Sequence, residues 1–302
     1  MFLASCRRHF DSSRWLSPAL QFRNYPDPAH PYDGHPVTWD DGLQQATGQR
    51  VCVIIHGYNN SLPSILEAYA DMQVRMTTSG VIGPQGYGLV IGFAWPGWTA
   101  PAYAAARATA NRAGLRLRPF LQALTAVALA VDVEAHSLGC RVVLSALRRK
   151  NGPRLDNLLL AAAAVDHSIL EPGRMFHSSL DLCERGFVYY SRRDEVLRRS
   201  YPVGDLADGI QKALGCTGPR RPATILRACP NLYLVDCTTA IGKHHSGYRT
   251  SAAYWAHWYR VLVNDPLPQT DVLAPKVRSP GLFGLAQSHQ SLHQRTRSAS
   301  KN

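Results

Sequence analysis

The sequence has no long uninterrupted hydrophobic run. Nowhere in its 302 residues do about 18 apolar residues, the length that a membrane-spanning helix needs, follow one another. The alanine-rich segment 102–130 is interrupted by 4 arginines. Residues 3–6, Leu-Ala-Ser-Cys, are similar to a lipoprotein cleavage box, but the charged and apolar segments of an export signal do not precede them. We therefore expect a cytoplasmic protein without a transmembrane segment.

Metal-binding and cofactor-binding patterns are also missing. The 7 cysteines are scattered, odd in number, and never spaced as Cys-x-x-Cys. Such usage indicates reduced, mostly buried thiols and excludes a disulfide framework or a zinc site. The sequence contains no phosphate-binding glycine loop, zinc-finger spacing or aromatic RNA-binding signature. We expect no metal, no cofactor and no specific nucleic-acid partner.

Acidic residues are few, 21 against 33 lysines and arginines, so the formal net charge is +12. Part of the excess follows Asp271, where 5 basic residues meet no acid. We interpret residues 266–302 as a flexible basic tail. The alternative is a tail that makes transient contact with nucleic acid or anionic lipid.

The sequence does contain short apolar runs that alternate with helix-like segments. This alternation predicts an α/β fold with a mostly parallel, doubly wound sheet and helices on both faces. We expect one such domain over residues 50–265, preceded by an extension, 1–49, with a possible edge strand. Gly114 or Pro119 is expected to interrupt the alanine-rich helix. The apolar runs cover 50–60, 88–98, 130–134, 157–166, 186–197 and 231–239.

A serine stands between a strand-like run and a helix-like run, in Ala135-His136-Ser137-Leu138-Gly139. A sharp strand-to-helix turn strains the backbone of the turn residue and leaves room only for small neighbours, which Ala135 and Gly139 are. The turn also lifts the Ser137 hydroxyl clear of the sheet. The Leu138 N–H then lies at the positive end of the new helix, where a developing oxyanion is stabilised. Ser137 is therefore the expected nucleophile.

This motif resembles the Gly-x-Ser-x-Gly elbow of the α/β-hydrolase superfamily, with Ala135 in place of the first glycine. The run VIIHGYNN is similar to the oxyanion strand and loop of those enzymes. FAWP, followed by a tyrosine-containing helix, resembles a mostly bacterial branch of α/β hydrolases of unknown function. The similarity covers roughly residues 50–263. It implies an α/β-hydrolase fold, in which the backbone N–H of Tyr58 is the second oxyanion donor and Asn59 lies close by.

The same resemblance implies an acid and then a histidine after the nucleophile. Asp194 follows a strand at the expected place, while Asp166 is the alternative after the preceding strand and Asp236 a third position. HHSGY is similar to the His-Ser-x-Tyr ending of the branch, which favours His245 as the base and leaves His244 as the alternative. Two exposed loop histidines without a catalytic role are the competing interpretation.

These residues imply a serine hydrolase that cleaves a carboxylic ester or thioester through an acyl-enzyme on Ser137. An acyltransferase with the same triad, a non-catalytic binding protein with the same fold, and a basic adaptor acting through the tail are the alternatives. The expected partner is a small-molecule or lipid-like acyl substrate. Trp95 and Asn59 either line its pocket or only pack. His56 and His136 come too early in the chain for the base and are expected to pack.

Overall fold

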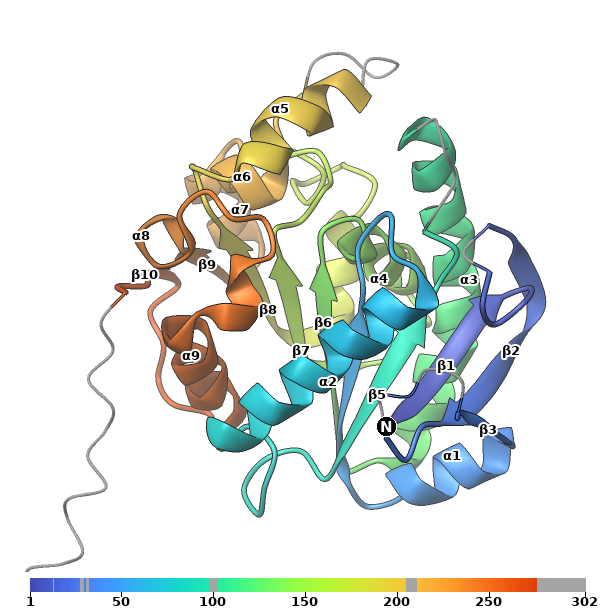
Figure 1. The fold of residues 1–302 in the computed structure, drawn as a ribbon. Helices are drawn as coiled ribbons and strands as arrows, with labels where there is room; N and C mark the ends of the chain where they lie inside the picture. Colours follow the sequence, from blue (N-terminus) through green and yellow to red (C-terminus); the bar gives the residue numbers. More distant parts are fainter. Residues whose placement is uncertain (13, 28–29, 31–32, 98–102, 205–210, 276–302) are drawn as a thin grey trace, which may run out of the picture.

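The computed structural model describes residues 1–275 apart from 13, 28–29, 31–32, 98–102 and 205–210, with the backbone alone for 202–204. Its centre is a 10-stranded sheet in the order β10-β9-β8-β7-β6-β4-β5-β1-β2-β3 (Figure 1). Helices cover both faces of this sheet, so the predicted α/β fold class is confirmed.

The six central strands are parallel to one another. Helices cover both faces of the sheet. The side chains of the central strands are therefore buried in near-continuous runs and not in alternation. This burial explains the short apolar runs of the sequence. The strands are β4 (Arg50–Ile55), β5 (Leu89–Ala94), β6 (Ala130–His136), β7 (Leu155–Ala161), β8 (Cys183–Tyr190) and β9 (Leu232–Asp236).

The sheet extends beyond residues 50–265 on both sides. Strand β1 (Phe2–Arg7) pairs in parallel with β5 and is followed by two antiparallel strands, β2 (Leu16–Asn24) and β3 (His35–Val37). On the other side, β10 (Thr270–Val272) pairs in parallel with β9. The first 49 residues thus supply three strands where one edge strand was expected. Strand β1 is an interior strand, buried along its whole length.

Two helices on each face do most of the covering (Figure 1). α2 (Leu62–Thr78) and α9 (Ala252–Leu262) lie on one face, and α3 (Tyr103–Val127) and α4 (Gly139–Leu147) on the other. The prediction of a break in the alanine-rich helix was wrong, because α3 runs unbroken through Pro119. Gly114 has a packing role instead: a Cβ there would lie 2.5 Å from the carbonyl oxygen of Val142 in α4.

The remaining helices are short or lie at the ends of the sheet. They are α1 (Trp39–Ala46), α5 (Glu195–Gly204), α6 (Leu214–Thr217), α7 (Pro222–Ala228) and α8 (Thr238–Ile241), with the 3-10 helices η1 (His177–Leu182) and η3 (Gly247–Thr250). α5 follows β8 at the carboxyl-end edge of the sheet, at the top of Figure 1. Over the described residues, no helix combines the length and the apolar character needed to cross a membrane.

Candidate active site

Ser137 occupies the turn between β6 and α4, at the carboxyl end of the central strand. Its φ of 55° is in the left-handed region, which a residue with a side chain adopts only under strain. Gly139 is required here, because a Cβ on it would lie 2.5 Å from the backbone oxygen of His56. The local geometry is therefore the strand-to-helix elbow that the sequence predicts.

Backbone hydrogen bonds hold this strained turn in place. The Ser137 N–H donates to the Ala161 oxygen at 2.9 Å, which ties the turn to β7. The Ser137 oxygen accepts from the N–H groups of Cys140 and Ala164, both at 3.1 Å. With its own backbone groups paired to two neighbouring segments, the turn holds the hydroxyl in one position.

The structure brings Ser137, His245 and Asp194 into one hydrogen-bonded chain. His245 Nε2 lies 2.9 Å from Ser137 Oγ, and His245 Nδ1 lies 2.7 Å from Asp194 Oδ2. Since a carboxylate accepts at Nδ1, the proton of the neutral ring is held on that nitrogen, and Nε2 can accept the serine proton. In the sequence, His245 lies 51 positions after Asp194 and 108 positions after Ser137.

Asp194 is fixed by its surroundings as well as by His245. Its side chain is 1 % exposed, and its second oxygen, Oδ1, accepts from the Leu197 N–H at 2.9 Å in the first turn of α5. A buried carboxylate with both oxygens paired keeps a single orientation. Asp194 thus holds one imidazole tautomer and orients the ring toward Ser137.

The alternative acids and base of the sequence prediction lie elsewhere. Asp166 accepts from both the N–H and the hydroxyl of Ser168, at 2.6 and 2.9 Å, in a turn after β7. Asp236 accepts from Arg192 Nε at 3.2 Å. His244 is exposed, next to the inward-facing His245. Among the five candidates, His245 is hydrogen-bonded to Ser137, and Asp194 is hydrogen-bonded to His245.

Two backbone N–H groups belong to residues beside the elbow, Leu138 and Tyr58. Leu138 follows the serine directly, at the start of α4, and Tyr58 lies in the loop after β4, next to Gly57. A Cβ on Gly57 would lie only 2.9 Å from Ser137 Cβ, so the loop closely approaches the elbow. Within the described part of the chain, neither the Tyr58 nor the Leu138 N–H has a hydrogen-bond acceptor. Both are suited to donate to an oxyanion.

His56 and Trp95 fix this loop against β5. The Trp95 indole N–H donates to the His56 oxygen at 2.8 Å, and the Trp95 backbone N–H donates to His56 Nε2 at 3.1 Å. Burial, with a smaller contribution from Arg7, lowers the pKa of His56 well below its usual value. His56 is therefore neutral, and its Nδ1–H donates to the Gly57 oxygen at 2.8 Å.

Neither Trp95 nor Asn59 is among the described residues that line the cavity of about 180 Å³ beside Ser137. Trp95 is fully buried because its indole packs and bonds against His56. Asn59 is exposed, with a φ of 60°, and its N–H donates to the Gly97 oxygen. Both residues shape the loop and do not line the cavity described below.

Arg7 is a site residue that the sequence prediction missed. It is the last residue of β1, fully buried, and donates from Nε to the Trp95 oxygen at 3.1 Å and from Nη2 to the Asn60 oxygen at 2.9 Å. Burial lowers the pKa of its guanidinium to about 10. One buried arginine thus joins the ends of two loops at the active-site edge.

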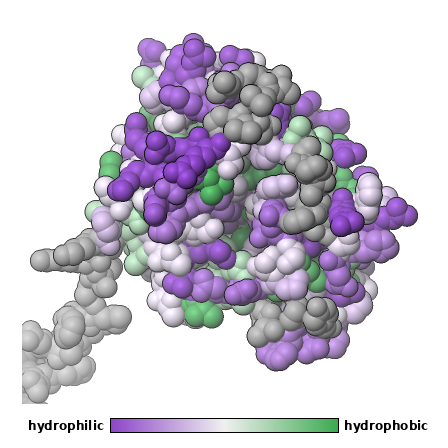
Figure 2. Space-filling view, turned by 45° about the horizontal axis from the view of Figure 1, so that its top comes forward, coloured by the Kyte–Doolittle hydropathy of each residue, from purple (hydrophilic) through white to green (hydrophobic). Residues whose placement is uncertain are grey.

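A cavity of about 180 Å³ opens beside Ser137 and His245. One wall comes from α2 and the opposite wall from η3. Apolar residues line it on α2 (Ala68, Tyr69, Met72) and at the end of β4 (Ile54, Ile55), and polar residues come from β6 and from η3 (Glu134, His136, Arg249). The surface at this edge of the sheet is mainly hydrophilic, with hydrophobic residues visible between polar ones (Figure 2).

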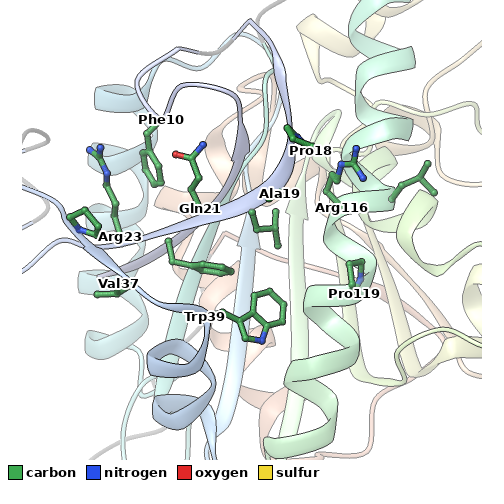
Figure 3. A pocket seen from close by; sticks show the side chains of 13 residues that line it. Phe10, Pro18, Ala19, Gln21, Arg23, Val37, Trp39, Arg116 and Pro119 are labelled. Carbon is green, nitrogen blue, oxygen red and sulfur yellow. The ribbon is translucent and has the colours of Figure 1, made fainter.

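A larger hollow, about 710 Å³, lies far from these residues. Figure 3 shows it over β2, lined by side chains such as Phe10, Trp39 and Arg116. None of the predicted site residues lines it, and no histidine or carboxylate does so. Ser137 and His245 line the smaller cavity instead.

His136 is neutral and acts as a support for His245. Burial first, and the nearby His245 second, lower the pKa of His136 to about 3. Its Nε2–H donates to the backbone oxygen of His245 at 2.9 Å, and the two rings lie 4.7 Å apart. It fixes the loop that carries His245.

Glu134 is a buried carboxyl group under the same site. Its side chain lies two residues before His136 on the same face of β6, and burial raises its pKa to about 8. The Tyr254 hydroxyl lies 3.4 Å from Oε1, whereas Oε2 has no hydrogen-bond partner within the described part of the chain. At neutral pH Glu134 is therefore mostly protonated.

The raised pKa of Glu134 predicts a pH dependence of stability. Above 4.5 the unfolded chain ionises this group, while the folded protein holds its proton until about 8. The contribution of Glu134 to the free energy of unfolding is therefore fully present below pH 4.5. It is lost as the pH rises from 4.5 to about 8, by up to about 1.4 kcal/mol per pH unit. In Glu134→Gln the free energy of unfolding should fall less steeply with pH. Urea unfolding across the window measures both slopes, and equal slopes would contradict the shift.

Comparison with protein families gives a match to a family of α/β hydrolases. The model of a family described as alpha/beta hydrolase of unknown function matches residues 37–222, more than half of the chain. The matched range includes Ser137 and Asp194, and ends before His245. A search of curated proteins finds no match. Among the described residues, no three His, Cys, Asp or Glu side chains are grouped so that they could hold a metal ion.

Proposed function

Since the chain belongs to this family of α/β hydrolases of unknown function, we propose that it is a serine hydrolase. It cleaves a carboxylic ester or thioester through an acyl-enzyme on Ser137. The observation that carries this proposal is the position of His245 between Ser137 Oγ, at 2.9 Å, and Asp194 Oδ2, at 2.7 Å. A serine hydroxyl is a weak nucleophile at neutral pH, and an adjacent base held by an acid makes it reactive.

In the acylation step, His245 Nε2 takes the proton from Ser137 Oγ while the oxygen attacks the substrate carbonyl carbon. The carbonyl oxygen becomes an oxyanion and accepts hydrogen bonds from the Leu138 and Tyr58 N–H groups. Collapse of the tetrahedral intermediate breaks the bond to the alcohol or thiol, and His245 returns its proton to that leaving group. The acyl group remains on Ser137.

Deacylation repeats the same steps with water as the nucleophile. His245 removes a proton from water, the hydroxide attacks the acyl carbonyl, and the bond to Ser137 Oγ breaks as the serine regains its proton. Asp194 accepts the hydrogen bond from Nδ1 and stabilises the imidazolium in both steps. The substrate is an acyl compound that enters the cavity of about 180 Å³ either whole or with its acyl part.

We also propose that the protein works in the cytoplasm. All 7 cysteines are free and buried, as expected for a reducing compartment. Fractionation of the cells that make the protein, followed by detection with an antibody, tests this proposal. Recovery from the membrane or secreted fraction would contradict it.

The proposed function is tested by rapid mixing with 4-nitrophenyl acetate. An acyl-enzyme predicts a burst of nitrophenolate, with an amplitude of one per chain, before slower steady turnover. Ser137→Ala should abolish both the burst and the turnover. A folded wild-type protein without turnover or burst would favour the non-catalytic binding protein instead.

Loss of Arg7 is expected to impair catalysis from a distance. Arg7→Met leaves the Trp95 and Asn60 oxygens without their donor, so the loop that carries the Tyr58 N–H loses its anchor. We expect kcat/KM for 4-nitrophenyl esters to fall by about 10-fold, mainly through kcat.

The matched control is Arg8→Met, because Arg8 is the exposed neighbour of Arg7 in the chain. It should keep the wild-type kcat. Equal activities for the wild type and both variants would show that Arg7 does not position the loop.

A further inference from the structure

We infer that the hollow of about 710 Å³ over β2 binds a carboxylic acid with an alkyl chain, and that Arg116 receives its carboxylate. This inference does not rest on the proposed function, because neither Ser137 nor His245 lines the hollow. It is carried by an apolar surface that has an arginine on each side and no acid among its described lining residues.

Most of the residues that line the hollow are apolar. Phe22 from β2 and Trp39 from α1 both line it, and their rings meet edge to face at 5.2 Å. Leu115 and Pro119 line it from α3, and Leu115 is 51 % exposed. The volume of about 710 Å³ lies within the range of roughly 300–1,000 Å³ that is usual for small-molecule sites. An alkyl chain in the hollow would cover this apolar surface.

Arg116 lies at one side of the hollow in a fixed orientation. It projects from α3, and its Nε donates to the Ser17 oxygen on β2 at 3.2 Å, so the side chain reaches from the helix to the strand. Within the described part of the chain, Nη1 and Nη2 have no hydrogen-bond acceptor and no carboxylate pairs with Arg116. Two N–H donors on one guanidinium match the two oxygens of a carboxylate.

Arg23 adds a positive charge at the other side. Its guanidinium carbon lies 4.6 Å from the centre of the Phe10 ring, which also lines the hollow. In the view of Figure 3, Arg23 and Arg116 lie on opposite sides, with Trp39 between them. Because the described lining residues include no acid to offset these charges, the hollow favours an anion over a neutral or cationic molecule of the same shape.

The same charges disfavour an occupant from the chain itself. The segment after Asp271 carries 5 basic residues and no acid, and the whole chain has a formal net charge of +12. The basic tail, or a second copy of the chain, would bring positive charge toward Arg23 and Arg116. A carboxylate brings the opposite charge, so a separate anionic molecule fits the hollow better than either.

Isothermal titration calorimetry with three ligands of matched chain length tests the inference: decanoate, decanol and decylammonium, each at concentrations at which it is monomeric. The wild type should bind one decanoate per chain, about 10-fold or more tightly than decanol, and decylammonium more weakly still. Arg116→Gln should weaken decanoate binding by about 10-fold and leave decanol binding nearly unchanged. Arg116→Glu should bind decylammonium more tightly than decanoate.

Arg112→Gln is the matched control, because Arg112 lies one turn before Arg116 on α3 and does not line the hollow. It should bind decanoate as the wild type does. Ser137→Ala should also keep the wild-type affinity, so the inference and the proposed function can fail separately. Circular dichroism and urea unfolding show whether each variant is folded.

A wild type that does not bind decanoate, or binds decanol equally well, would overturn the inference. An unchanged affinity in folded Arg116→Gln would do the same. An equal loss in Arg112→Gln would mean that the overall charge of the protein, and not Arg116, selects the ligand. Loss of binding in Ser137→Ala would place the decanoate in the cavity beside the catalytic serine and would likewise overturn the site over β2.

Discussion

Replacing Ser137 with alanine is expected to lower kcat for ester hydrolysis by about 10⁴-fold or more, the range seen when the nucleophile of a serine hydrolase is removed. The hydroxyl is the atom that forms the covalent bond, and alanine offers no substitute. The backbone strain at φ 55° does not depend on the hydroxyl, so the variant should fold. Rates with 4-nitrophenyl butyrate and circular dichroism check both statements.

A second buried serine controls for the loss of a hydroxyl in general. Ser168 is also buried, and its hydroxyl donates to Asp166 at 2.9 Å, away from His245. Ser168→Ala should keep activity near the wild-type level. If Ser137→Ala retained more than about a tenth of the wild-type kcat, acyl transfer to this serine would not be the mechanism.

The second large effect is expected at His245 and Asp194. His245→Ala removes the base and should cost about as much as Ser137→Ala. Combining the two should cost little more, because the residues act as one unit. Asp194→Asn should lower kcat by about 10⁴-fold, since the amide can donate to Nδ1 and favour the wrong tautomer.

The alternatives of the sequence prediction provide matched controls. Asp166→Asn and His244→Ala change the same residue types near the same edge of the sheet, but neither side chain contacts Ser137 or His245. Both variants should stay within about threefold of wild-type kcat/KM, as surface changes away from a site usually do. If His244→Ala lost most of its kcat/KM while His245→Ala kept the wild-type value, the assignment of the base would be reversed.

Local sequence signals were enough to predict the elbow and the fold class. A strained turn needs small neighbours, so Ala135 and Gly139 marked Ser137 within five residues of sequence. Parallel strands buried on both faces need continuous apolar runs, so the central strands were visible one by one. For Asp194 and His245, the order of residues in a resembling superfamily selected the positions, and only the fold brought them within hydrogen-bond distance.

Features that depend on distant contacts could not be predicted. Nothing around Arg7 shows that it bonds to the Trp95 and Asn60 oxygens, 88 and 53 positions away. The first strand, FLASCR, carries small and polar residues, so its burial inside the sheet gave no clear strand pattern. Gly114 or Pro119 was expected to interrupt the alanine-rich helix, but α3 runs unbroken through both positions, and Gly114 lies close to α4.

Glu134 lies between the features that the sequence predicts and those that it cannot predict. Its sequence position indicates a buried carboxyl group. A carboxylate inside the buried run of β6 (Ala130–His136) is unusual enough to need an explanation, since charged side chains are seldom fully buried without a partner. Asp132 has the same signal and is explained by its pairing with Tyr87 and Asn157. The sequence alone does not distinguish the paired carboxylate from the unpaired one, since the partners come from other strands and helices.

The convergence of Ser137, His245 and Asp194 is most directly tested by covalent labelling. Folded wild-type protein is treated with a fluorophosphonate, and the adduct is counted by intact mass and located by peptide mass spectrometry. We predict one adduct per chain, on Ser137, and a much slower reaction in His245→Ala. An unlabelled folded protein, or an adduct on any other residue, would contradict the account.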